Sequence, residues 1–348
     1  AEGRHAEARE RARFWVHKLT AMRDPELDEV IDFLREVGEH GEAAVQQHML
    51  ERQPELQELA TLLANAPAVA SLYTLDPDDE RAGPLEPKPV LRKALRDWDK
   101  TVGGDTLSFD DTPMDANRIT DWIPVLRAHP SLWNAFEVLD AIAAGVRECA
   151  AEILARVIEQ PLLERAEQLL HEVLRANHAE GKRLEWGWLE NRPALRLLGW
   201  RIASAGEVFG NPGQLARLEW LVRVLNPNDN QGFRHTLVLA YLHAGRPADA
   251  LAVCADYPED LAAMRYNRVL ALYAAGQHGA ALQALHEAVA AYPKPLAWLL
   301  KTKPKAPRLS DYGIRVGGDD EAWHYREESL ALWEIGRASC RERVSVVV

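Results

Sequence analysis

The amino-acid sequence predicts an all-α protein in which antiparallel helical hairpins stack into an α-solenoid. Apolar residues recur at helical spacing through most of the 348-residue chain. No segment shows the alternation of apolar and polar residues that is typical of a half-buried β-strand. A helix–turn–helix pattern occurs twice at a spacing of 31 residues, and a fixed period of this length is typical of solenoid proteins.

The amino-terminal region, residues 1–117, is predicted to contain helices joined by irregular loops. Residues 76–87 are rich in proline and acidic side chains, which predicts a loop. Residues 101–117 lack a helical pattern, and we expect a surface insertion there. Five helices are expected in this region. Three cover residues 4–22, 42–51 and about 89–98, and the other two begin at the start signals Asp24-Pro25 and Gln53-Pro54.

Helical spacing returns at Arg118, and residues 118–300 are predicted to form the repeat array. An apolar helix is expected over about 149–159. Pro161 is then expected to begin a second helix, because proline is common at the first helical position.

Two turn glycines, Gly245 and Gly276, align the two copies of the hairpin pattern. Ala250 and Ala281 each stand five residues after their glycine, where a small side chain lets two helices approach closely. Pro258 falls early in the first copy, which predicts that the second helix of this copy is shortened.

A third, weaker copy extends the array toward the amino terminus. Pro227 stands seventeen residues after Gly210, the distance that also separates Pro293 from Gly276. Each hairpin exposes an apolar face that a neighbour has to cover, so at least about three copies are needed for a stable array.

The repeat pattern resembles the tetratricopeptide repeat. The segments Glu185–Pro193 and Asn226–Arg234, together with Glu321–Glu327, are similar to motifs of a group of functionally uncharacterised bacterial tetratricopeptide-repeat proteins. The resemblance covers roughly 162–333. It implies a helical scaffold, and it brings no activity, cofactor or catalytic residue with it.

The carboxyl-terminal part consists of a connector and a final helix, residues 301–333, followed by residues 334–348. The last fifteen residues resemble the translation of a sequencing-library adapter. We therefore expect 334–348 to be a non-native tail and the natural chain to continue differently after Trp333. Because the chain begins at Ala1 rather than Met, we also expect that residues are missing upstream.

The motif around Asn226 has a structural interpretation. Asn226 and Pro227 are expected to end one helix, and side-chain oxygens of residues 228–230 are expected to cap the next. Gly232 is expected to allow a tight approach. Arg192 and Arg234 have two open interpretations: they pair with nearby carboxylates such as Glu185, Glu190 or Asp229, or they point into a ligand groove.

Composition excludes several function classes. A formal charge of -12 argues against a general nucleic-acid binder, because phosphate backbones require a basic surface. The apolar runs are too short to span a bilayer. Three widely separated cysteines and scattered histidines form no metal-ligand spacing, so no metal or cofactor is predicted. A reduced, cytoplasmic setting is the expectation.

We therefore expect a non-catalytic scaffold that binds a partner peptide or protein in a groove. One alternative is an enzyme with an acidic site in residues 76–117, near Asp105, Asp110 and Asp111, which uses the repeats as a platform. Another is a regulatory sensor whose effector domain followed Trp333. The candidate groove residues are Trp186, Trp188, Arg192, Asn230, Arg234, Asn267 and Arg268.

Overall fold

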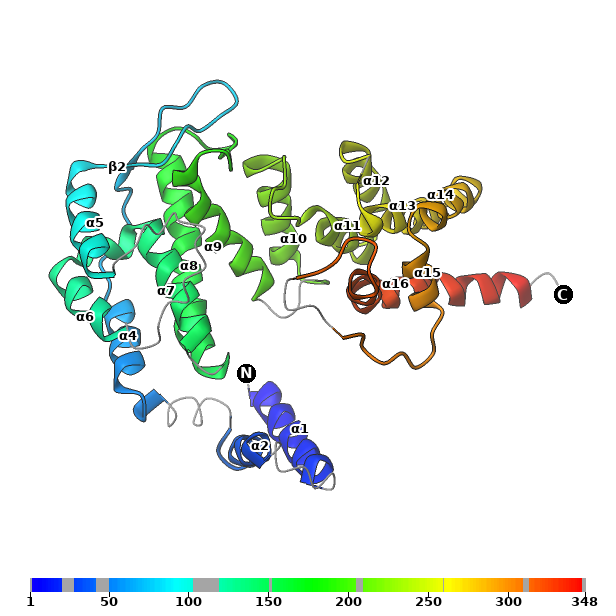
Figure 1. Cartoon of the computed structure of the whole chain (residues 1–348), viewed down its shortest axis with the longest axis horizontal. Helices are drawn as coiled ribbons and strands as arrows, with labels where there is room; N and C mark the ends of the chain where they lie inside the picture. Colours follow the sequence, from blue (N-terminus) through cyan, green and yellow to red (C-terminus); the bar gives the residue numbers. More distant parts are fainter. Residues whose placement is uncertain are drawn as a thin grey trace. The chain divides into compact units, whose positions relative to one another are not determined.

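The computed structural model describes residues 2–20, 28–41, 50–102, 119–149, 152–204, 209–258, 260–308 and 313–345. These residues are mostly helical, and helices that follow one another in sequence pack in pairs (Figure 1). The predicted helical class is thus confirmed. The chain divides into two compact units, Ala1–Arg201 and Ile202–Val348.

One small sheet interrupts the helices of the described chain in the first unit. Strand β1 (Tyr73–Thr74) pairs antiparallel with β2 (Glu86–Pro87), so that Tyr73 lies opposite Pro87. Two residues per strand are too few to produce an alternating pattern, which is why the sequence predicts no strand here.

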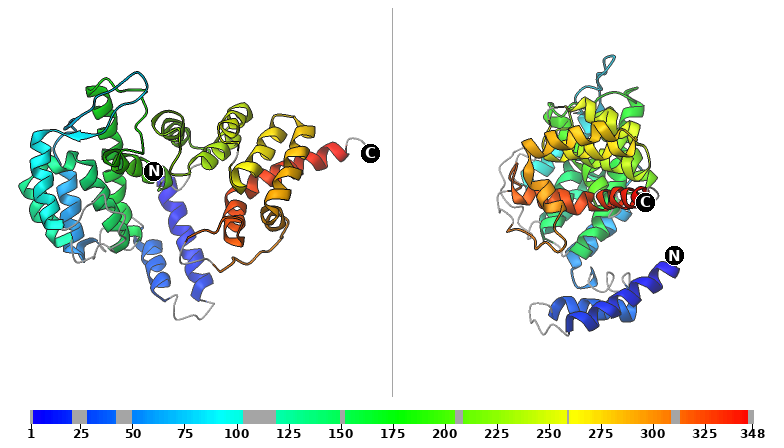
Figure 2. Two further views of the ribbon diagram at one scale, coloured as in Figure 1. Left: turned by 45° about the horizontal axis from the view of Figure 1, so that its top comes forward. Right: turned by 90° about the vertical axis from the view of Figure 1, so that its right-hand side faces the viewer.

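The first unit begins with a helical hairpin, in which α1 (Glu2–Thr20) packs along α2 (Asp28–His40) (Figure 2). Elsewhere in the first unit, Trp98 and Trp122 are both buried, with ring centroids 6.1 Å apart and ring planes tilted by 40°. Among its described residues, this unit also contains α4 (Pro54–Ala64), α5 (Pro89–Val102), α6 (Ile119–Ala128), α7 (Phe136–Cys149) and α8 (Glu152–Ala176), with 3₁₀ turns over Pro130–Asn134 and Leu189–Asn191.

The expectation that Pro161 begins a new helix is wrong, because α8 continues through it. Ile158, Leu162 and Ala166 lie on one face of α8 and are all buried. A continuous apolar face of this kind stabilises the helix by tertiary packing, which outweighs the hydrogen bond that a proline removes.

The division between the two units falls near the end of helix α9 (Arg192–Ala203), so the second unit begins at Ile202. It contains α10 (Pro212–Glu219), which runs into a π-helical turn, η5 (Trp220–Leu225), and then the two hairpins of the repeat pattern. These hairpins consist of α11 (Arg234–His243), α12 (Pro247–Asp256), α13 (Ala262–Ala274) and α14 (His278–Ala291).

The two hairpins turn through the same hydrogen-bond pattern. Gly245 and Gly276 have positive φ angles of 68° and 76°, a region that glycine enters without strain. In the first turn Arg246 N–H donates to the Tyr241 carbonyl at 2.8 Å, and in the second Gln277 N–H donates to the Leu272 carbonyl at 2.9 Å. This six-to-one bond over a left-handed residue is the Schellman cap, so the sequence period reappears as a conformational period.

Helix α13 packs against both hairpins of the second unit, since it contacts α11, α12 and α14. As predicted from Pro258, α12 is the shorter second helix, with 10 residues against 14 in α14.

The chain then continues through α15 (Pro293–Leu299) and a connector to α16 (Asp319–Ser345), which includes most of the segment expected to be non-native. Helix α16 packs against α11, α13 and α15.

Candidate functional site

The loop before α11 is organised by one buried carboxylate. Asp229 is 2% exposed, and its oxygens accept the backbone N–H groups of Phe233 and Arg234 at 2.9 and 2.8 Å. The Arg234 guanidinium donates to Asp229 at 3.0 Å and also binds both carboxylate oxygens of Asp260. Arg234 therefore joins the start of α11 to the segment that leads into α13. Of the two interpretations of Arg234, the structure therefore has the one in which it pairs with carboxylates, and Asp229 is one of the expected partners.

Asn230 and Gly232, in the same loop as Asp229, do not have the roles expected from the sequence. Asn230 is exposed, so among the three expected acceptors of residues 228–230 the cap of α11 is supplied by Asp229. Gly232 has a φ of 80°, and a Cβ atom placed on it would meet nothing within 4 Å. The expectation that Gly232 allows a tight approach is therefore wrong, because it is the left-handed backbone that favours glycine here.

A cavity of about 450 Å³ lies beside α13, a size within the usual range of ligand pockets. Leu251 and Cys254 of α12, Met264 of α13 and Ala284 of α14 contribute to its walls. The full lining is Leu251, Cys254, Ala255, Tyr257, Pro258, Asp260, Met264, Arg265, Arg268, Leu272, Ala284, Glu287 and Ala288.

The charged groups of this cavity differ in how far they are already engaged. Arg265 donates through Nε to the Asp260 carbonyl at 3.0 Å. Burial opposes ionisation of Asp260, but hydrogen bonds from Arg234 and from the Leu261 N–H hold its pKa below the usual value. Arg268 is exposed and makes no hydrogen bond or ion pair with any described residue. Arg268 is thus the cation of this cavity that an incoming anion can use.

The cavity's possible nucleophile is not activated. Burial raises the pKa of the Cys254 thiol to about 12, and the nearby positive charge of Arg268 only partly offsets this. A thiol with this pKa is protonated at neutral pH and is a poor nucleophile.

Helix α16 packs against α13, and its Trp333 also contacts the apolar cluster that contains Leu272 and Ala284 of the cavity lining. The ring of Tyr266 lies 5.6 Å from that of Tyr325 and 6.3 Å from that of Trp333. Asn267, one of the predicted groove residues, is fully buried next to this contact, and its amide donates to the His235 carbonyl at 3.2 Å. Asn267 and Arg268 are neighbours in sequence, yet the first joins two helices and the second faces the cavity.

The predicted groove residues of the first unit form a local cluster. Arg192 donates from Nε to the Trp186 carbonyl at 3.0 Å, and its guanidinium lies 5.4 Å from the Trp186 ring centroid. Trp186 and Trp188 are half-buried. Three of the seven candidates thus lie in this cluster, and the other four lie in the second unit. Binding of a partner by these residues stays a prediction.

Asn191 lies within the same motif, and its residue type and position do not mark it as a site residue in the sequence. It is fully buried and accepts the Leu85 N–H at 2.9 Å. Its amide donates to the Glu185 carbonyl at 3.1 Å and to the Gly83 carbonyl at 3.3 Å. Asn191 thereby connects the loop before β2 to the motif at 185–193. Because Leu85 and Asn191 are 106 residues apart in the sequence, only the folded structure reveals this role.

The described part of the acidic region contains a turn around Asp78 that is bonded to Lys182 and Arg183. Asp78 accepts the N–H groups of Glu80 and Arg81 at 2.9 and 2.7 Å, as well as Nε of Arg81 at 2.8 Å. Hydrogen bonds from Arg81 lower the pKa of Asp78 to about 2. Asp105, Asp110 and Asp111, the residues of the alternative acidic site, lie outside the described residues.

No group of three or more His, Cys, Asp or Glu side chains that could hold a metal ion occurs in the described part of the chain. None of the helices within this part of the chain combines the length and the apolar character needed to cross a bilayer.

Comparison of the chain with protein-family models, with curated proteins and with solved structures produced no match.

Proposed function

We propose that this chain is a non-catalytic protein-interaction scaffold with a tetratricopeptide-like repeat fold. The observation that carries the proposal is the cavity beside α13, which combines apolar walls with an unengaged arginine. Apolar anchoring with a few polar groups that set orientation is how helical repeats recognise protein segments. The resemblance of residues 162–333 to uncharacterised bacterial repeat proteins belongs to the same proposal.

The partner docks in the cavity beside α13 rather than in the contact between α13 and α16. At that contact, Tyr325 and Ser329 of α16 are buried, so a partner would first have to displace this helix. In the cavity, an apolar side chain of the partner contacts Leu251, Met264 and Leu272, and a carboxylate of the partner binds Arg268.

A scaffold role is supported by the protonation states around the cavity. The Cys254 thiol is held protonated by burial, and the Asp260 carboxylate is occupied by Arg234. Neither group is available as a nucleophile or general base. A cytoplasmic setting completes the proposal, and the unpaired thiol of Cys254 is compatible with it.

Photo-crosslinking at matched positions tests the proposal. A photoreactive amino acid replaces either Ala255, an exposed residue of the cavity lining, or Leu282, an exposed residue of α14 outside that lining. In an extract of the source cells, we expect a discrete protein adduct from position 255, absent from position 282 and suppressed by Met264→Trp, which fills the cavity. Equal labelling from both positions, or none from 255, would overturn the docking site.

A further inference from the structure

We propose that residues 301–308, the first half of the connector between α15 and α16, bind an extended acidic segment of a partner protein. Between Glu287 and Asp311 the chain carries five basic residues and no acidic residue, although the whole protein has a formal charge of -12. The basic residues are Lys294, Lys301, Lys303, Lys305 and Arg308.

Three of these cations are unengaged. Lys294 pairs with Asp319 at 3.0 Å, and the Lys301 ammonium lies 3.2 Å from the Trp298 ring centroid. Lys303, Lys305 and Arg308 are exposed and make no hydrogen bond or ion pair with any described residue. Like charges held close together repel, and an anionic partner removes this cost on binding.

The backbone of the connector is equally accessible. Pro304 and Pro307 exclude a helix, and each proline biases the residue before it toward an extended conformation. The N–H groups of Lys303, Lys305 and Arg308 donate no hydrogen bond to a described residue. A partner segment that lies extended along residues 304–308 can therefore accept the Lys305 N–H, while the exposed side chains of Lys303 and Arg308 stay open to its carboxylates.

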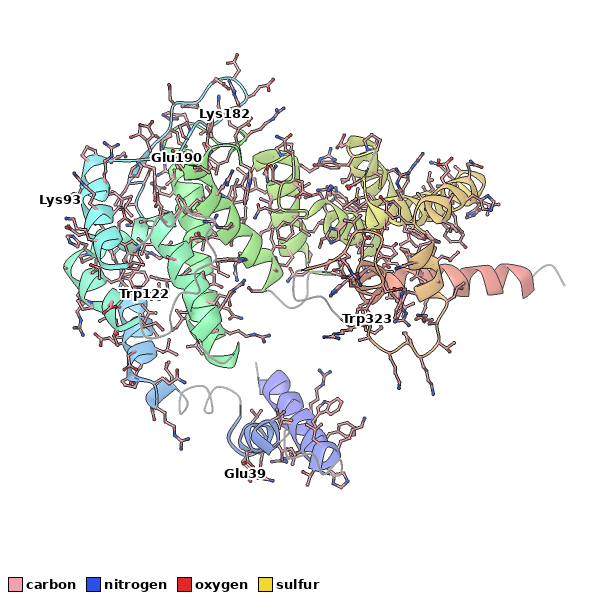
Figure 3. All side chains as sticks on the ribbon, in the orientation of Figure 1. Glu39, Lys93, Trp122, Lys182, Glu190 and Trp323 are labelled. Atoms are coloured by element: carbon pink, nitrogen blue, oxygen red, sulfur yellow. The ribbon has the colours of Figure 1, made fainter. Side chains whose placement is uncertain are left out.

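The amino-terminal end of the connector is held in place, which lowers the entropy cost of binding. Arg326 of α16 donates from Nε to the Trp298 carbonyl at 3.1 Å and from Nη2 to the Lys301 carbonyl at 3.4 Å. The Trp298 indole donates to Asp319 at 3.0 Å and packs edge-on against Trp323, which projects from α16 (Figure 3). The unengaged lysines thus begin only two residues after a fixed point.

Spacing and charge together favour a short acidic protein segment over a nucleic acid. Lys303, Lys305 and Arg308 fall within six consecutive residues. A short extended segment with carboxylates at alternate positions can reach all three. A long polyanion would also meet the rest of an acidic protein, whereas screening over about 8 Å confines a short segment to the local basic charge.

Fluorescence anisotropy with the full chain tests this proposal. The probe is a labelled peptide of alternating Glu and Ser, with a Gln–Ser peptide as the neutral reference. The test variant K303Q/K305Q and the control K93Q/R96Q each remove two exposed positive charges, and Lys93 projects from α5 (Figure 3). We expect the test variant to weaken binding about fivefold and the control to change it less than about twofold, since exposed ion pairs contribute about 0.5 kcal/mol each.

Each other outcome overturns the proposal. Equal losses in both variants show a nonspecific attraction to the acidic probe. Binding of the neutral peptide at the same strength shows that charge is not the determinant. Tighter binding of a single-stranded RNA of equal charge assigns the connector to a nucleic acid instead. The Arg268→Glu variant is expected to bind the acidic probe like the unchanged protein, so this test is independent of the cavity beside α13.

Discussion

Replacing Asp229 by alanine removes the acceptor that caps α11 and one of the two carboxylates around Arg234. Loss of a helix cap costs about 1 kcal/mol. Loss of a buried hydrogen bond to a charged group adds about 2 kcal/mol. Arg234 keeps Asp260 as a partner, so the larger cost of an unpaired buried charge is not reached. The expected loss is therefore about 3 kcal/mol in the opening free energy of α11.

Hydrogen-exchange mass spectrometry of the full chain measures this effect, because it resolves α11 from the rest of a two-unit protein whose global unfolding need not be two-state. About 3 kcal/mol corresponds to about a 150-fold faster exchange of the α11 amides. Asp229→Asn retains an oxygen acceptor, so we expect an intermediate effect. Asn230→Ala is the matched control, since Asn230 is the exposed neighbour. Exchange in Asp229→Ala that stays within about threefold of this control would refute the capping role.

Three further predictions concern stability, each measured by chemical denaturation. Gly245→Ala and Gly276→Ala are each expected to destabilise the second unit by about 1 kcal/mol, because alanine resists positive φ. The control Gly279→Ala, within α14, is expected to be neutral or stabilising. Similar losses of stability at all three positions would contradict this prediction. Gly145→Ala places a Cβ against the Trp122 ring and is expected to cost about 2 kcal/mol, and an unchanged midpoint would show that the ring can shift freely. Burial raises the pKa of Glu137 from 4.5 to about 6, so the folded state binds this proton more tightly than the unfolded chain, and stability falls as pH rises through this window by about 2 kcal/mol. Glu137→Gln is expected to lose this part of the pH dependence, and an unaltered pH profile would show that Glu137 does not cause it.

The helical character and the position of the hairpin turns could be predicted from sequence because both depend on local rules. Helical spacing of apolar residues needs no knowledge of distant contacts, and Gly245 and Gly276 mark left-handed turns that other residues resist. The short α12 followed in the same way from Pro258. The continuous helix through Pro161 could not be predicted, because it is stabilised by neighbours that buried Ile158 and Leu162 meet only in the folded unit.

The candidate site shows the same division. By itself, the sequence determined that the Asn226–Gly232 segment ends one helix and caps the next, because capping depends on residues a few positions apart. Only the tertiary structure decided that Arg234 binds Asp260, that Asn191 holds a loop 106 positions away, and that Asn267 and Arg268 face opposite environments. Side chains that are neighbours in sequence diverge in this way because a helix turns about 100° per residue, so the packing of other helices determines which are buried and which can meet a partner.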